Sequence, residues 1–237
     1  TASANASGAD SFEYTITDDD GDASTATVYL TIDALEFPTL LVDETVGQQA
    51  DPADTVSDRV SSADFSGAFA SVAGATYALS VTDTNGAAVP AGVASGVFAV
   101  DRAPGAVGQG QQILLYNTAE GIEGRITNPI TGSGEWVYFT ISTDDSGTIT
   151  LSQQFKDPTS NYDLTMFNPD GSNPDDVVSL DGTGLYQINL TQTAGGASES
   201  VDLAAGVFSF ADAVPDAKND FEGDALVVAA DGSVAFN

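Results

Sequence analysis

The chain has 237 residues and is strongly acidic: 35 Asp and Glu residues stand against 5 Lys and Arg residues, and the formal net charge is −30 at pH 7. Such an excess of negative charge repels nucleic acids and anionic membrane surfaces, and no apolar run is long enough to span a bilayer. Nucleic-acid binding and membrane insertion are therefore excluded as expected functions. The hydrophobic fraction of 42% predicts a folded chain rather than a disordered acidic tail.

The inventory of side chains argues against an enzyme. The sequence contains neither His nor Cys, so it offers no imidazole base, no thiol nucleophile and no nitrogen or sulfur ligand for zinc. A pair of carboxylates of the kind that glycosidases use has no support in the spacing of the acidic residues. For small β units without disulfides, bound metal is the stabiliser that this composition favours.

Residues 10–32, DSFEYTITDDDGDASTATVYLTI, predict a β-hairpin. Apolar residues alternate with polar ones in both arms, and the apolar positions are Phe12, Tyr14, Ile16, Ala26, Val28, Leu30 and Ile32. A period of two residues predicts half-buried strands. Because a two-stranded hairpin is only marginally stable in water, we expect further strands to complete its sheet.

The turn of this hairpin is a candidate calcium site. Asp18, Asp19, Asp20 and Asp22 crowd around Gly21, which lets the chain bend sharply. Carboxylates around a glycine turn suit a hard cation with oxygen ligands, and Ca²⁺ tolerates six to eight such ligands in irregular geometry more readily than Mg²⁺ does. The alternative is an ordinary solvated acidic turn. The run is shorter than an EF-hand loop and lacks the closing Glu of that motif.

After a predicted linker at residues 33–38, the pattern is all-β. A short strand is predicted to begin at Leu40, and two hairpins are predicted around the turns at residues 83–86 and 144–147. The strands beside these turns are residues 75–82, 136–142 and 148–154. Backbone requirements explain the acidic residues of both turns more simply than calcium does. The sole tryptophan, Trp136, is predicted to be a core residue rather than a sugar-stacking platform.

A second oxygen-rich stretch lies at residues 157–176, DPTSNYDLTMFNPDGSNPDD. Its candidate calcium ligands are Asp163, Asn168, Asp170, Asn173, Asp175 and Asp176. Asp and Asn side chains also cap and bend loops without metal, so a purely structural role is the alternative for this stretch.

The C-terminal residues 216–237, DAKNDFEGDALVVAADGSVAFN, alternate around an Asp231–Gly232 turn and stop in mid-strand. Reading Asn237 straight into Thr1 gives a continuous pattern that resembles the closing half of the small Ig-like or cadherin-like repeats of giant bacterial adhesins. The matching motifs are residues 230–233, 8–14 and 18–22. The resemblance implies one period of a tandem array, in which residues 214–237 of one copy and residues 1–34 of the next form one small domain. In that domain Asp216 and Asp220 would approach the acidic turn.

The remainder, residues 35–213, resembles the long repeat domain of giant type-I-secreted adhesins of the RTX type. The resemblance rests on ordered motifs, which are residues 42–45, 77–81, 113–115, 122–125, 137–141, 145–151, 157–161, 173–180 and 184–191. It departs at residues 193–198, where the family often has an acidic loop and this chain has TAGGAS. The resemblance implies β-sandwich modules in tandem.

We therefore expect a structural extender of an extracellular adhesin or fibre on a bacterial surface, in which calcium stiffens head-to-tail copies that mediate attachment or biofilm cohesion. The alternative is a calcium-dependent module that binds a carbohydrate or another cell-surface ligand through residues 157–176. Loss of glycan binding in an Asp170→Ala variant that still folds would favour this alternative.

Overall fold

The computed structural model describes residues 7–33, 35–43, 59–101, 108–129, 131–154, 166–167, 177–181, 184–203 and 206–211. Within these ranges the chain forms fifteen β-strands and one short 3-10 helix, η1 (Ser66–Ala68). The predicted all-β class is confirmed. No helix in these ranges has the length and hydropathy needed to cross a membrane.

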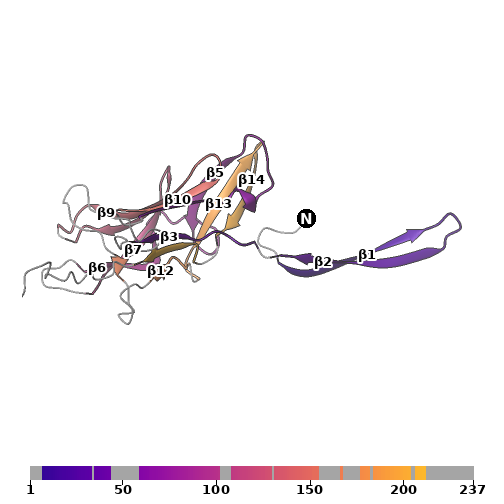
Figure 1. Ribbon diagram of the computed structural model, residues 1–237, viewed down its shortest axis with the longest axis horizontal. Coiled ribbons are helices and arrows are strands. Elements are labelled where there is room, and N and C mark those ends of the chain that lie inside the picture. Colours follow the sequence, from indigo (N-terminus) through magenta and orange to yellow (C-terminus); the bar gives the residue numbers. More distant parts are fainter. Residues whose placement is uncertain are drawn as a thin grey trace, which may run out of the picture.

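The N-terminal hairpin consists of β1 (Gly8–Thr17) and β2 (Ala23–Ile32), which among the described strands pair only with each other. It projects from the rest of the protein as a separate arm (Figure 1). The predicted hairpin is confirmed, but the prediction of half-buried strands is wrong for this chain. Phe12 is 53% exposed and Tyr29 is 81% exposed, because no other described strand covers either face of the arm.

The largest sheet has seven strands in the order β11-β6-β7-β8-β9-β10-β4. Its strands are β4 (Val60–Asp64), β6 (Val93–Val100), β7 (Gln109–Asn117), β8 (Gly121–Thr127), β9 (Glu135–Thr143), β10 (Thr148–Gln153) and β11 (Met166–Phe167). All neighbours in this sheet are antiparallel. The hairpin predicted around residues 144–147 is confirmed as β9 and β10.

Two three-stranded sheets complete a sandwich-like body. One has the order β12-β15-β3, with β3 (Leu40–Asp43), β12 (Val177–Ser179) and β15 (Phe208–Ala211). The other has the order β14-β13-β5, with β5 (Thr76–Thr82), β13 (Gln187–Ala194) and β14 (Ala197–Asp202). Strand β15 pairs antiparallel with β12 but parallel with β3.

The prediction of a hairpin after residues 75–82 is wrong. Strand β5 is followed by a turn closed by Asp83 and Gly86, but it meets the next segment only at an isolated bridge between Thr82 and Ala88. Its partner is instead β13, more than one hundred residues further along the chain. Local turn chemistry predicts where a strand ends, whereas the choice of partner depends on which apolar face the core can cover.

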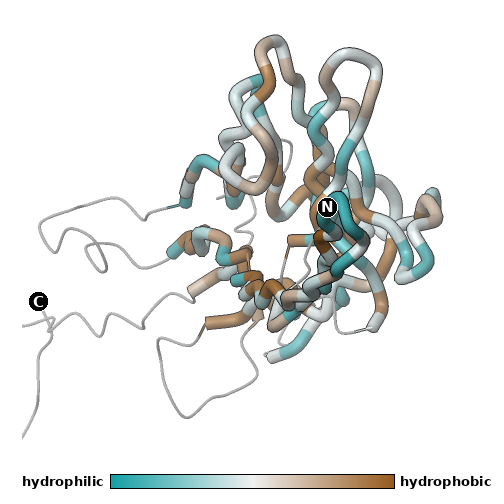
Figure 2. Tube along the Cα trace, turned by 90° about the vertical axis from the view of Figure 1, so that its right-hand side faces the viewer, coloured by the Kyte–Doolittle hydropathy of each residue, from teal (hydrophilic) through white to brown (hydrophobic). Residues whose placement is uncertain are grey.

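The core lies where the sheets face each other. The ring of Phe139 in β9 packs against the ring of Phe210 in β15 with centroids 4.8 Å apart, which joins the seven-stranded sheet to the sheet of β3, β12 and β15. Trp136 is only 1% exposed, so its predicted place in the core is confirmed. In Figure 2, hydrophobic segments gather in the middle of the body.

Candidate metal centre

The acidic turn that joins β1 to β2 is closed by backbone hydrogen bonds. The Asp18 N–H donates to the carbonyl of Asp22 at 3.0 Å, and the Gly21 N–H donates to the carbonyl of Asp18 at 3.2 Å. Gly21 has φ of +98°, a conformation that residues with a Cβ rarely adopt. The glycine thus permits a bend tight enough to bring alternate side chains of the turn together.

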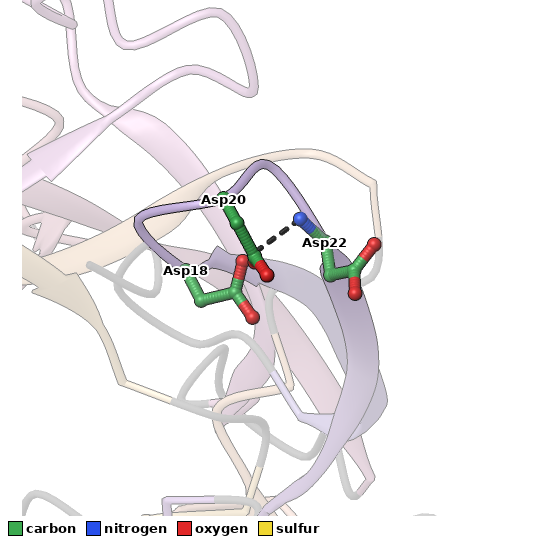
Figure 3. Close-up of side chains that lie close together, drawn as sticks. All are labelled: Asp18, Asp20 and Asp22. Atoms are coloured by element: carbon green, nitrogen blue, oxygen red, sulfur yellow. Dashed lines mark hydrogen bonds between the residues drawn. The ribbon is translucent and has the colours of Figure 1, made fainter.

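Three of the four predicted ligands in this turn converge. One carboxylate oxygen each of Asp18, Asp20 and Asp22 lies within 4.8 Å of the others, and all three residues are exposed. Figure 3 shows the carboxylates of Asp18 and Asp20 side by side, with that of Asp22 further along the turn. Asp19 lies on the same turn and is exposed, but it does not belong to this cluster.

Hydrogen bonds hold the Asp18 carboxylate in place and lower its pKa. The largest cause is a side-chain hydrogen bond with Asp20, and burial opposes the shift only in part. The Asp22 N–H donates to Oδ1 of Asp18 at 2.8 Å, which also favours the ionised form (Figure 3). The turn thus gathers three acidic side chains whose negative charge a divalent cation would offset.

The donor set fits Ca²⁺ in kind but is incomplete. Three carboxylates supply only hard oxygen ligands, whereas Ca²⁺ takes about six to eight. The further ligands predicted for this site, Asp216 and Asp220, lie outside the described residues, as do Asp170, Asn173, Asp175 and Asp176 of the second predicted stretch. Their participation stays a prediction.

Two other acidic turns use their carboxylates on the backbone, as predicted. Oδ1 of Asp83 accepts from the N–H groups of Asn85 and Ala87, each at 2.8 Å. Oδ1 of Asp144 accepts from the N–H groups of Ser146 and Thr148, at 2.9 and 3.0 Å. The backbone bonds lower the pKa of Asp83. The pKa of Asp144 is lowered most by the Ser146 hydroxyl, which donates to Oδ1 at 2.7 Å, and further by the backbone bonds, because all of them stabilise the ionised form.

The sequence reasoning missed one charged cluster on the body. Arg125 in β8 forms ion pairs with Glu123 at 2.7 Å and Glu135 at 2.8 Å, and it lies over the ring of Tyr116 with 5.0 Å from Cζ to the centroid. Burial opposes ionisation of the guanidinium, but the two carboxylates outweigh it and raise the pKa of Arg125. The sequence feature that could have indicated this cluster is the scarcity of basic residues. With 5 Lys and Arg residues against 35 Asp and Glu residues, each cation has many carboxylates available to pair with it.

A family model described as a domain of unknown function, DUF5801, matches residues 39–204. The chain belongs to this family. No curated protein and no solved structure matches the chain significantly. The DUF5801 region begins one residue before β3 and covers every described strand of the sandwich-like body except β15.

The acidic cluster lies outside the DUF5801 region, because the β1–β2 arm precedes residue 39. The predicted ligands between Asp170 and Asp176 lie inside it. The two candidate calcium sites therefore differ in kind: one belongs to the arm that leads into the family domain, and the other to the domain itself.

The Asp144 turn of the DUF5801 region predicts a pH dependence of stability. Since the folded-state pKa of Asp144 is lowered, its hydrogen bonds stabilise the fold above the unfolded-state pKa of about 3.9 and are lost as pH falls through the lower folded-state value. We expect the stability difference between wild type and Asp144→Asn to stay constant from pH 7 to about 5 and to shrink below about 4. Urea unfolding followed by Trp136 fluorescence measures it.

The matched control is Asp145→Asn, which makes the same change of charge in the same turn but removes none of these acceptors. A constant difference for Asp144→Asn down to pH 3 would contradict the assigned role of the carboxylate.

Proposed function

We propose that the protein is a structural extender: a DUF5801 module that is joined end to end with other copies in an extracellular adhesin or fibre on a bacterial surface. One observation carries the proposal. Strand β3, where the chain enters the body, and β15, the last described strand, are parallel neighbours. Parallel strands begin at one end of their ladder and finish at the other, so the chain enters and leaves this ladder at opposite ends.

The exposed arm favours the presence of a neighbouring copy at the end of the body where the chain enters. Cross-strand partners share a face of the hairpin, and the register pairs Phe12 with Val28 and Tyr14 with Ala26. One face of the arm is therefore apolar yet exposed, with Ile16 at 64% and Phe12 at 53% exposure. In the proposal, residues 216–237 of the adjacent copy cover this face, because their own alternation predicts strands with an apolar side.

Calcium would act as the stiffener of this junction. Extracellular calcium sites have dissociation constants of about 10⁻⁴ to 10⁻³ M. At a calcium concentration about ten times the dissociation constant, one site stabilises the folded form by roughly 1.4 kcal/mol. The cluster of Asp18, Asp20 and Asp22 lies on the arm, so an ion bound there would neutralise the negative charge gathered in the hairpin turn.

Solution scattering of two copies joined from Asn237 to Thr1 tests the proposal. In millimolar calcium we expect a maximum dimension close to twice that of one copy, and a shorter average dimension with broader flexibility after chelation. If the two-copy chain is compact in calcium, the proposed extender role is wrong. If its dimensions do not change on chelation, the proposed stiffening by calcium is wrong.

The chain offers a matched pair of variants for the metal. Asp20→Asn removes a member of the cluster, whereas Asp19→Asn makes the same change of charge next to it. We expect Asp20→Asn to weaken calcium binding by about tenfold or more, because affinity follows the number of anionic ligands, and Asp19→Asn to weaken it much less. Calorimetric titration measures both, and equal effects would assign the binding to general charge rather than to the cluster.

A further inference from the structure

The first and last described strands of the sandwich-like body, β3 and β15, form one short parallel ladder, and β15 lies just after the DUF5801 region. The register pairs Leu40 with Phe208 at its beginning and Asp43 with Ala211 at its end. The Leu40 N–H also donates to the carbonyl of Val207 at 2.7 Å, which extends the ladder at the end where the chain enters. Tension along the chain is therefore applied to opposite ends of this ladder.

The direction of that tension is along the strands. A pull on the residues before β3 draws β3 backwards, and a pull on the residues after β15 draws β15 forwards. Because the two strands are parallel neighbours, these pulls slide them past each other instead of peeling them apart. The bonds of the ladder are then loaded together.

Sliding requires more force than peeling for the same bonds. A hydrogen bond is lost within about 1 Å of stretching. When the strands slide, the energy needed to break all the bonds of the ladder must therefore be supplied over that short distance. Peeling one residue pair from a ladder lengthens the chain by about 7 Å, twice the rise per residue, and loads only one pair at a time. Force is energy divided by distance, so the sliding geometry is the stronger one.

The ladder is also shielded from water, and its β15 strand is anchored to the rest of the body. Val42 and Phe210 are fully buried, and Leu40 and Phe208 are each 1% exposed. Buried bonds do not exchange readily with water, which would otherwise replace them as they stretch. On its edge away from β3, β15 pairs with β12, and the ring of Phe210 packs on Phe139 of the seven-stranded sheet.

We propose that the β3–β15 ladder is a mechanical clamp, the element of this module that bears load when an array of copies is under tension. The inference rests on the proposed end-to-end arrangement, since only that arrangement pulls on both ends of the body. The ladder keeps the body folded under tension, while the arm and the junction take up bending.

Single-molecule force spectroscopy on the full chain tests the clamp. Because the chain has no Cys, a pair of introduced cysteines defines the points of attachment, kept reduced until handles are coupled. Thr39→Cys with Asp212→Cys loads the ladder by sliding. Thr191→Cys with Ser200→Cys, a cross-strand pair of β13 and β14, peels an edge strand of the same body. We expect an unfolding force several times larger in the first geometry, and equal forces would overturn the clamp.

Two matched variants separate mechanical from thermodynamic effects. Val42 in β3 and Val81 in β5 are both fully buried, so Val42→Ala and Val81→Ala remove the same groups from the same core. We expect both variants to lower the midpoint of urea unfolding. We expect only Val42→Ala to cause a clear loss in the unfolding force measured between residues 39 and 212. Equal losses of force in the two variants would overturn the clamp. In that case, scattering that shows two joined copies to be extended would still support the proposed extender role, so the two proposals can fail independently.

Discussion

Replacing Phe139 with Ala is expected to remove a large part of the stability of the body. The ring is fully buried and touches Phe210 across the two facing sheets, with centroids 4.8 Å apart. It also lies over Gly124, where an added Cβ would be 2.3 Å from the ring. Truncation of a buried Phe costs about 3–5 kcal/mol, against a total of about 5–15 kcal/mol for a typical domain.

Urea unfolding followed by the fluorescence of Trp136 measures this loss, because the only tryptophan is buried three residues away in the same strand. The matched control is Phe12→Ala, which truncates the same side chain where it is 53% exposed on the arm. We expect the control to leave the unfolding midpoint of the body nearly unchanged. A Phe139→Ala variant as stable as wild type would show that the two sheets are held together by other contacts.

Replacing Gly121 with Ala is expected to have a similar effect for a different reason. Gly121 opens β8 with φ of +142°, and a Cβ built there would lie 2.2 Å from the carbonyl oxygen of Ile141 in β9. That oxygen belongs to the backbone of a central strand, so it cannot move aside as a flexible side chain would. Backbone strain and overpacking together cost about 2–5 kcal/mol.

The control for Gly121 is Gly132→Ala. Gly132 has φ of +67°, and an added Cβ there would meet nothing within 4 Å. This substitution therefore carries only the conformational cost, about 1 kcal/mol. The difference between the two variants in urea unfolding isolates the contact with Ile141, and equal losses of stability would mean that the strand relaxes around the added methyl group.

The two proposals assign different tasks to different parts of the chain. The arm, with its acidic turn and exposed apolar face, would connect successive copies and respond to calcium. The sandwich-like body, with its buried β3–β15 ladder, would withstand the resulting tension. The division agrees with the burial pattern, since the two strands of the hairpin are almost wholly exposed and a two-stranded hairpin is only marginally stable in water.

Much of the candidate site was predictable because it is local. The alternation of Phe12, Tyr14 and Ile16 and the glycine in the acidic turn were sufficient to predict the β1–β2 hairpin and the convergence of three of the four turn carboxylates. The roles of Asp83 and Asp144 as backbone acceptors were predictable for the same reason, since an Asp side chain reaches N–H groups only two to four residues away.

The sequence by itself determined the all-β class, the β1–β2 and β9–β10 hairpins and the buried place of Trp136, because alternation and turn chemistry act between near neighbours in the chain. Only the tertiary structure decided that β5 pairs with β13, that β3 pairs in parallel with β15, and that the apolar face of the arm is exposed in the single chain. Those features depend on which apolar faces meet across more than one hundred residues, and strands with the same alternation are interchangeable until the core selects among them.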